Sequence, residues 1–155
     1  MADRITKSIR VNAPIKKVYQ TWARFENFPL FMENIKGVRM IGPRTSIWEA
    51  EGPLGSNISW KAETVDMQED KQIEWRSIED EDINLQTDGI VTFTPVTSDS
   101  TLVTVSLQYS PVGSAAGEAL AKIFSNPEKQ LQQDLENFKV LVEDNENPKV
   151  SKNKE

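Results

Sequence analysis

The sequence contains neither cysteine nor histidine among its 155 residues. Without cysteine the chain has no disulfide, no thiolate nucleophile and no cysteine ligand for a metal. Without histidine it lacks the side chain that most often serves as a general base near neutral pH and as a metal ligand. We therefore expect no metal and no cofactor, and any catalysis would depend on carboxylates, lysine, arginine, tyrosine or bound water.

Long apolar runs and excess positive charge are also missing. No run of apolar residues approaches the roughly 20 that a helix needs to cross a bilayer. The first ten residues lack the apolar core of a signal peptide. The net charge of −6 argues against recognition of a phosphate backbone. We expect a cytoplasmic monomer or homodimer that neither inserts stably into a membrane nor binds nucleic acid.

What the chain does contain is enough apolar material for one folded domain. Hydrophobic residues make up 37% of the sequence, including four Trp and six Phe, and a chain of this length buries roughly two thirds of its unfolded surface on folding. We place the domain at residues 1–143. Residues 144–155 are mainly polar and charged, so we expect them to form a disordered tail.

The first part of the chain predicts a strand followed by two short helices. Apolar and polar side chains alternate over Arg4–Val11, which is typical of a strand. Pro14–Arg24 carries apolar residues at helical spacing, so it predicts a helix with one apolar face. Glu26–Asn34 is too apolar for an exposed loop and contains Pro29. We interpret this segment as a second short helix or helical turn.

Alternation with a period of two dominates the middle of the chain. Turn residues interrupt it about every ten positions, which predicts an antiparallel meander. The predicted strands are Ile35–Ile41, Ser46–Glu51, Ser56–Met67, Gln72–Ile78, Ile83–Pro95 and Thr101–Ser110. In each strand one face is aromatic or aliphatic and the other is charged or hydroxylated, as in Trp60 against Lys61. The sheet therefore needs a cover on one side only.

The end of the chain predicts that cover, as a helix in two pieces. Ser114–Phe124 and Leu131–Val142 each have an apolar face, and Asn126 with Pro127 reads as a helix cap followed by a proline in the first turn. We expect the first piece to act as a gate and the second to hold the sheet.

Two sets of residues carry a resemblance to a known family. The first lies in the predicted strands: Trp60, Ala62, Ile73–Arg76, Gly89, Val91, Phe93, Thr101–Val105 and Tyr109. The second lies in the predicted terminal helix: Phe124, Pro127, Glu128, Leu131, Asp134, Leu135, Phe138 and Lys139. Together they resemble the polyketide cyclase/dehydrase group of the helix-grip superfamily, which includes START domains and birch-pollen-allergen-like proteins.

The resemblance implies an α+β helix-grip fold. In this fold a seven-stranded curved antiparallel sheet wraps around a long C-terminal helix, with two short helices between the first and second strands. Its members bind sterols, lipids, quinones, hormones and polyketides, so the resemblance implies a cavity between sheet and helix rather than a particular reaction.

We predict that aromatic and aliphatic residues of the concave side line this cavity. They are Trp22, Trp48, Trp60, Trp75, Phe93, Tyr109, Phe124, Leu131 and Leu135. The alternative is that these rings simply fill the core. Tyr109 is the one weak candidate for a catalytic group, because it alone among the strand residues places a titratable side chain on the apolar face. The alternative for Tyr109 is a phenol that only satisfies its own hydrogen bonds.

An entrance is predicted at one end of the sheet. In a meander, the connections Gly52–Gly55, Glu79–Asp82 and Ser110–Gly117 share that end. The predicted apolar lip residues are Phe28, Phe31, Leu54 and Val112. The alternative is that Gly52–Gly55 is an ordinary tight loop.

These observations favour binding of a hydrophobic small molecule such as a lipid, quinone or polyketide, by a carrier, sensor or chaperone of that ligand. One alternative is a cyclase or dehydrase that works without His, Cys or metal. A further alternative is an interaction protein that docks on a quinone-handling or membrane-associated partner.

Overall fold

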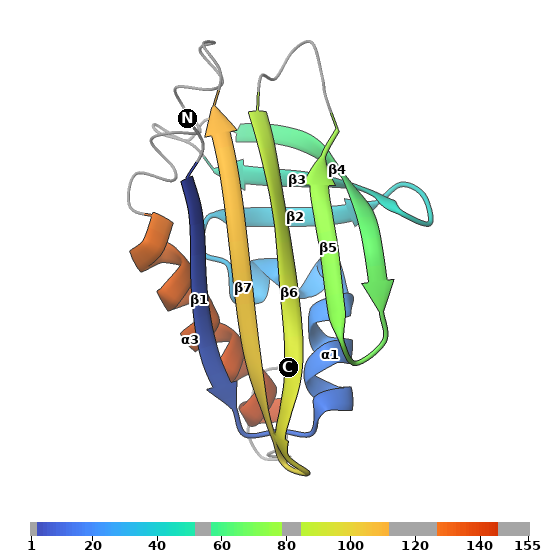
Figure 1. The fold of residues 1–155 in the computed structure, drawn as a ribbon. Helices are drawn as coiled ribbons and strands as arrows, with labels where there is room; N and C mark the ends of the chain where they lie inside the picture. Colours follow the sequence, from blue (N-terminus) through green and yellow to red (C-terminus); the bar gives the residue numbers. More distant parts are fainter. Residues whose placement is uncertain (1–2, 52–56, 79–84, 112–126, 146–155) are drawn as a thin grey trace.

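The computed structural model describes residues 3–51, 57–78, 85–111 and 127–145. The elements follow one another as β1 (Asp3–Val11), α1 (Ile15–Ala23), the 3-10 helix η1 (Phe25–Leu30), β2 (Ile35–Met40), β3 (Thr45–Glu51), β4 (Asn57–Gln68), β5 (Gln72–Ser77), β6 (Leu85–Thr97), β7 (Ser100–Pro111) and α3 (Pro127–Asn145). All seven strands form one antiparallel sheet in the order β1-β7-β6-β5-β4-β3-β2 (Figure 1). The predicted helix-grip fold is confirmed.

The sheet is strongly curved. In Figure 1, β1, β7 and β6 run across the direction of β2 and β3, and α1, η1 and α3 lie on the concave side. The pairing of β4 with β5 shifts register between Thr64 and Asp66. A bulge of this kind bends and twists a strand. The curvature leaves an interior that the helices cover from one side.

The alternation predicted from the sequence is confirmed in the strands. Ala50, Ala62, Ile73, Val91 and Val103 all lie on the concave side and are buried. Between these positions the side chains point outward, as Arg76 and Glu63 do, where their exposed charges lie 3.5 Å apart. Such exposed ion pairs contribute little to stability. The core is therefore built on one face of the sheet.

Each of the two short helical segments before β2 has a proline at its start or within it. Pro14 precedes the first turn of α1, where it needs no hydrogen-bond donor, and Pro29 lies inside η1. Their buried side chains are Val18, Tyr19 and Trp22 in α1 and Phe25 and Phe28 in η1. The predicted second helical turn is thus a 3-10 helix that packs against β2.

The terminal helix α3 begins at Pro127 and continues through Asn145, two residues beyond the predicted end of the domain. Its apolar face is buried as predicted, through Leu131, Leu135, Phe138 and Val142. The predicted first piece, Ser114–Phe124, lies outside the described residues. None of the described helices is long and apolar enough to span a membrane.

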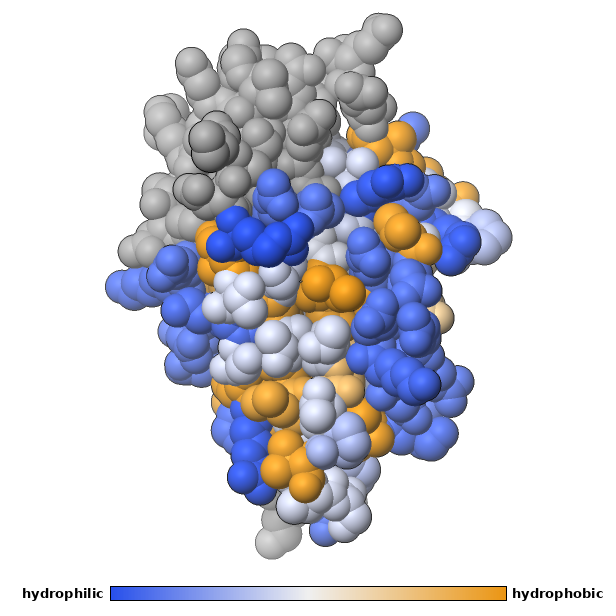
Figure 2. Space-filling model, viewed as in Figure 1, coloured by the Kyte–Doolittle hydropathy of each residue, from blue (hydrophilic) through white to orange (hydrophobic). Residues whose placement is uncertain are grey.

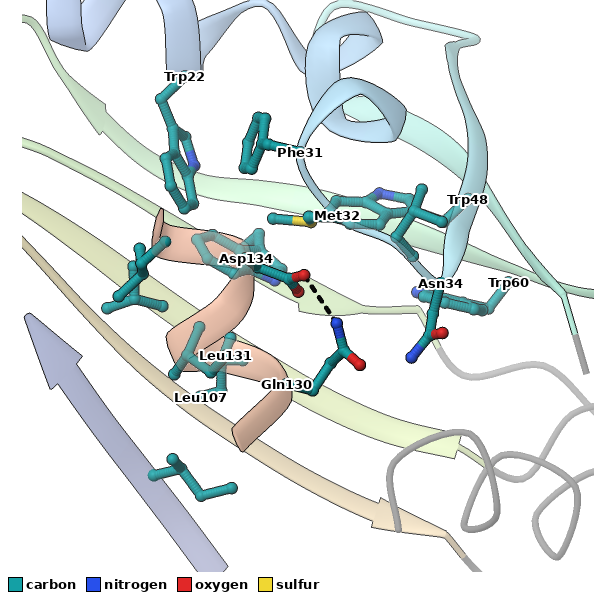
Figure 3. A pocket seen from close by; sticks show the side chains of 15 residues that line it. Trp22, Phe31, Met32, Asn34, Trp48, Trp60, Leu107, Gln130, Leu131 and Asp134 are labelled. Carbon is teal, nitrogen blue, oxygen red and sulfur yellow. Dashed lines mark hydrogen bonds between the residues drawn. The ribbon is translucent and has the colours of Figure 1, made fainter. Parts of the chain in front are cut away.

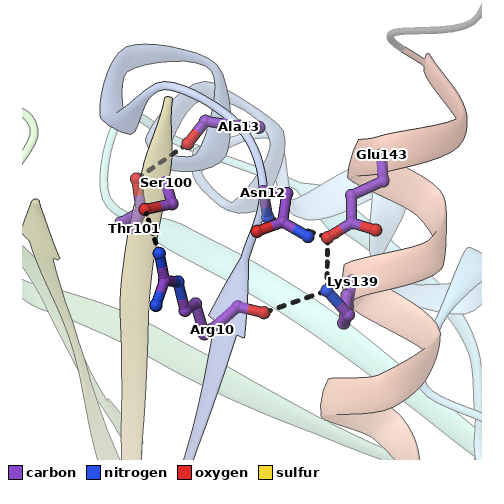
Figure 4. A network of polar contacts seen from close by, with 7 residues as sticks. All are labelled: Arg10, Asn12, Ala13, Ser100, Thr101, Lys139 and Glu143. Carbon is purple, nitrogen blue, oxygen red and sulfur yellow. Dashed lines mark hydrogen bonds and ion pairs between the residues drawn. The ribbon is translucent and has the colours of Figure 1, made fainter. Parts of the chain in front are cut away.

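Polar contacts fasten the second half of α3 to the start of the chain (Figure 4). Lys139 Nζ donates to the Arg10 carbonyl oxygen over 3.2 Å and pairs with Glu143 one turn later. Glu143 Oε2 in turn accepts the backbone N–H of Asn12 over 2.8 Å. These contacts hold the helix against the corner between β1 and α1.

Candidate ligand-binding cavity

A cavity of about 100 Å³ lies between the concave face of the sheet, the end of η1 and the first half of α3 (Figure 3). Most of its wall is apolar. The apolar lining residues are Ile5, Trp22, Phe31, Met32, Ile35, Trp48, Trp60, Trp75, Val105, Leu107, Leu131 and Leu135. The polar lining residues are Asn34, Gln130 and Asp134. An apolar pocket with a few polar groups is the usual form of a small-molecule site.

All four tryptophans of the chain line this cavity. Trp48 and Trp60 are register partners on β3 and β4, and their rings stack with centroids 6.0 Å apart. Trp48 Nε1 donates to Ser46 Oγ over 2.9 Å, which uses its only polar atom and fixes the ring. These two rings form a rigid flat wall.

The position of Trp75 depends on the absence of a side chain at Gly89. These residues are register partners on β5 and β6. A Cβ atom at Gly89 would lie 2.4 Å from Trp75 Cζ2 and 2.8 Å from Leu107 Cδ2. Because real Cβ contacts do not come this close, only glycine lets the Trp75 ring lie across β6.

Trp22 reaches the cavity from α1 within a cluster of phenylalanines. Its ring centroid lies 5.0 Å from that of Phe138, 5.3 Å from Phe31 and 5.7 Å from Phe28. The residue is only 1% exposed, and no group in the described part of the chain accepts a hydrogen bond from its Nε1. A buried donor without a partner costs about 1–3 kcal/mol. The Trp22 N–H is therefore an unused donor enclosed within the aromatic cluster.

Asp134 is the main ionisable group of the cavity. Its Oδ1 accepts a hydrogen bond from Gln130 Nε2 over 2.8 Å and a longer one, 3.4 Å, from the backbone N–H of Glu33. Burial raises the pKa of the Asp134 carboxyl to about 6, and the nearby charge of Glu33 acts in the same direction against these hydrogen bonds. The group can therefore gain or lose a proton near neutral pH.

Asp134 was not among the residues predicted to line the cavity; in the sequence it stands among the terminal-helix residues that carry the family resemblance. The available signal was its spacing. Asp134 follows Leu131 by three residues and precedes Phe138 by four, so it borders the buried face.

Of the nine residues predicted to line the cavity, six lie in its wall: Trp22, Trp48, Trp60, Trp75, Leu131 and Leu135. Phe93 does not, because its ring is packed behind Trp22 and against Tyr19, with the Tyr19 centroid 5.4 Å away. Phe124 and the side chain of Tyr109 lie outside the described residues, so the catalytic role suggested for Tyr109 stays a prediction.

Phe28 and Phe31, the predicted lip residues within and directly after η1, are buried and do not lie at an opening. Phe28 and Phe31 are each only 1% exposed, so neither is an apolar lip open to solvent. Phe28 packs between Phe25 and Trp48, with centroids 5.1 and 5.0 Å away, whereas Phe31 lines the cavity from within. The exposed apolar side chain of this segment is Leu30, at 64%. Leu54, Val112 and the three connections that were expected to form the entrance lie largely outside the described residues.

A curved antiparallel sheet that closes on a C-terminal helix around an apolar cavity defines the helix-grip fold. A family model described as polyketide cyclase / dehydrase and lipid transport matches residues 11–136. The chain belongs to this family, which confirms the resemblance seen in the sequence.

Two relatives that are just over one quarter identical cover most of the chain. An uncharacterised 17.2 kDa protein of Streptomyces lincolnensis is 26% identical over 144 residues, which are 92% of this chain and 91% of the relative. The crystal structure of a Deinococcus radiodurans protein, DR_A0006, is 27% identical with a TM-score of 0.69 and covers 88% of this chain and 95% of its own.

More distant structures show the same fold. The Zhui aromatase/cyclase from Streptomyces sp. R1128 has a TM-score of 0.74 at 13% identity, covering 92% of this chain and 94% of its own. A START superfamily protein from Mycobacterium smegmatis has a TM-score of 0.60 at 21% identity, covering 84% and 97%. At these identities the likeness concerns the fold and not the activity.

Proposed function

We propose that the protein binds a hydrophobic small molecule in the cavity between the sheet and α3, as a carrier or sensor of that molecule. The observation that carries this proposal is the cavity wall, in which four tryptophans and eight other apolar side chains surround three polar ones. Membership of a family that includes lipid transport supports it.

The size of the cavity narrows the class of ligand. Pockets for drug-sized molecules usually measure about 300–1,000 Å³, whereas this cavity measures about 100 Å³. An apolar protein cavity of about 150 Å³ can hold one benzene ring. This cavity is smaller, so it has room for no more than one ring, and we expect either a single compact ring or one ring of a longer molecule whose remainder leaves the cavity. The stacked Trp48 and Trp60 favour a flat ligand.

The chain supplies its own reporter for this test, since every tryptophan lines the cavity. Protein purified from its own host would be analysed by native mass spectrometry, and the extracted small molecules would be titrated back while tryptophan emission is recorded. We expect a retained apolar compound that quenches or shifts the emission. A protein that retains nothing and shows no emission change with lipids, quinones or aromatic ketones would contradict the proposal.

A cyclase or dehydrase activity is the second candidate, and Asp134 is the observation that favours it. A carboxyl with a pKa of about 6 beside an apolar cavity suits transfer of a proton near neutral pH. Asp134→Asn distinguishes the two functions: in an enzyme it would abolish turnover of a bound polyketide-like ketone, whereas in a carrier no turnover would be seen with either protein.

A further inference from the structure

The ionisable groups at the cavity carry charge of one sign. Among the described residues that line it, Asp134 is the only one with an ionisable side chain, and no lysine or arginine is present. The neighbouring charge that acts on Asp134 belongs to Glu33, which is also an acid. The described part of the cavity wall therefore presents a carboxylate and no cationic side chain.

The Asp134 carboxyl group faces the cavity. Figure 3 shows it extending from α3 toward the side where Trp48 and Trp60 lie, and both of these residues line the same space. Gln130 Nε2 donates to Oδ1 over 2.8 Å, and the longer contact of 3.4 Å from the Glu33 N–H also ends on Oδ1. An ionised carboxylate has about four acceptor positions on its two oxygens. Oδ2 therefore retains acceptor capacity that a ligand can use.

A carboxylate in this position is costly without a cation. Burial disfavours its charged form and raises the pKa of Asp134 to about 6, although the two hydrogen bonds on Oδ1 act in the opposite direction. At pH 8 the group is ionised, so the folded protein holds a negative charge beside an apolar cavity. A positive charge on a ligand would offset this cost more fully than a neutral hydroxyl group would, because hydrogen bonds between two charged groups are stronger.

The rest of the wall suits an organic cation better than a metal ion. Hard cations such as Ca²⁺ take about six to eight oxygen ligands, whereas the described residues contain no group of three acidic side chains that could hold a metal. Four tryptophans line the cavity instead. The face of a tryptophan ring attracts an ammonium group. The wall therefore combines one carboxylate with aromatic rings, which is a pairing that favours an ammonium ligand.

The available acceptor and the volume narrow the form of that ligand. Oδ2 can accept a hydrogen bond only from an ammonium group that still carries N–H, so a primary or secondary amine fits better than a quaternary one. The cavity of about 100 Å³ has room for no more than one ring. The net charge of −6 also attracts cations to the protein as a whole.

We propose that Asp134 selects ligands with a protonated amino group, by accepting the ammonium N–H at Oδ2 while the tryptophan-lined wall holds the compact ring that carries the amine. This inference rests on the proposed binding function and adds the charge of the ligand to it. A neutral molecule of the same shape would fit the apolar wall but would leave the carboxylate unpaired.

Three probes with the same ring and different charge test the proposal at pH 8. Benzylamine is cationic, benzyl alcohol is neutral and benzoate is anionic at this pH, and calorimetry with tryptophan emission measures their binding. We expect benzylamine to bind about tenfold more tightly than benzyl alcohol, because a charge-assisted hydrogen bond is roughly twice as strong as a neutral one. Benzoate should bind most weakly. Equal or tighter binding of benzyl alcohol would overturn the proposal while leaving the binding function intact.

Two variants on matched acids assign the effect to its residue. Asp134→Asn should weaken benzylamine about tenfold and change benzyl alcohol by less than about twofold. Glu33→Gln is the control, because it removes a neighbouring negative charge from an exposed side chain but keeps the cavity carboxylate and the backbone N–H at position 33. If Glu33→Gln weakens benzylamine as much as Asp134→Asn does, the amine responds to the general negative field, and the proposed contact with Asp134 is wrong.

Thermal unfolding and circular dichroism show whether each variant is folded. The comparison of the three probes needs only the natural protein, so it decides the proposal even if a variant does not fold. Failure of all three probes to bind a protein that retains a native ligand would overturn the proposed amine class alone. Failure of the probes together with absence of any native ligand would overturn the binding function as well.

Discussion

Along α3, the half from Pro127 to Leu135 borders the cavity, whereas the half from Phe138 to Glu143 is packed and hydrogen-bonded against the start of the chain. The first half is tied to β1 by a 3.9 Å ion pair between the half-buried Lys7 and the exposed Glu128, a long contact that adds little stability. The second half buries Phe138 and Val142 completely. One helix therefore holds the sheet at one end and leaves room for a ligand at the other.

This difference is energetic as well as geometric. Phe138 and Val142 of the second half are fully enclosed by protein, so truncating either leaves a new cavity. Side chains of the first half already border empty space, so their removal enlarges a cavity that exists. Stability should therefore depend mainly on the second half, and ligand affinity mainly on the first.

The largest expected effect comes from truncating the packed half. Phe138→Ala should lower the free energy of unfolding by about 3–5 kcal/mol, because the Phe138 ring is fully buried against Trp22 and Phe31. Leu131→Ala, the matched change in the cavity half, should cost about 2 kcal/mol and widen the cavity. Urea denaturation measures both. A larger loss for Leu131→Ala would contradict the division of the helix.

Next in size is a change in the sheet beside Trp75, a residue of the cavity wall. Gly89→Ala should lower stability by about 1–3 kcal/mol, since the new Cβ atom must displace Trp75. The displaced ring should also weaken ligand binding. Gly37→Ala is the control, because nothing lies within 4 Å of a Cβ atom there. Equal effects of the two substitutions on unfolding and on tryptophan emission would show that Trp75 has room to move.

The pH dependence of stability tests the burial of Asp134 in the cavity half. Its folded-state pKa of about 6 lies above the unfolded value near 4. Between these values the folded protein binds more protons than the unfolded chain, so this group lowers stability as pH rises from about 4 to about 6, and the loss persists above that range.

Relative to Asp134→Asn, the natural protein should lose roughly 2 kcal/mol over this range, less than the full shift because Asp134 is partly exposed. Glu136→Gln, an exposed change on the same helix, is the control. Denaturation curves at several pH values measure the difference. Parallel pH profiles for Asp134→Asn and the natural protein would mean that the carboxyl is not buried.

Local sequence patterns were sufficient to predict most of this fold. All seven strands, α1, η1 and the buried face of α3 follow from periods of two and of about 3.6 residues, because each element buries only one face. The concave positions of Trp48, Trp60 and Trp75 were predicted from the period of two, and the apolar-face position of Trp22 from the helical period.

The remaining parts depended on contacts between distant elements. Phe28 was expected at an opening, yet β2 and β3 cover it, and strand parity contains no information on that packing. Asp134 is at the edge of a helical face, where only the neighbouring element decides whether a side chain is buried. The unpartnered Trp22 nitrogen is likewise visible only once its neighbours are placed.

The smallest expected effect concerns the polar contacts of Lys139 and Glu143, which hold the packed half of α3 against the start of the chain. Glu143→Gln keeps the shape of the side chain but removes the charge that binds Lys139 and the Asn12 N–H. We expect a loss of about 1 kcal/mol in the free energy of unfolding, with Glu136→Gln again as the control near zero. Ligand affinity should not change, because Glu143 does not line the cavity. If affinity falls along with stability in Glu143→Gln, the two halves of α3 act as one unit, and the fastened end of the helix also sets the shape of the cavity.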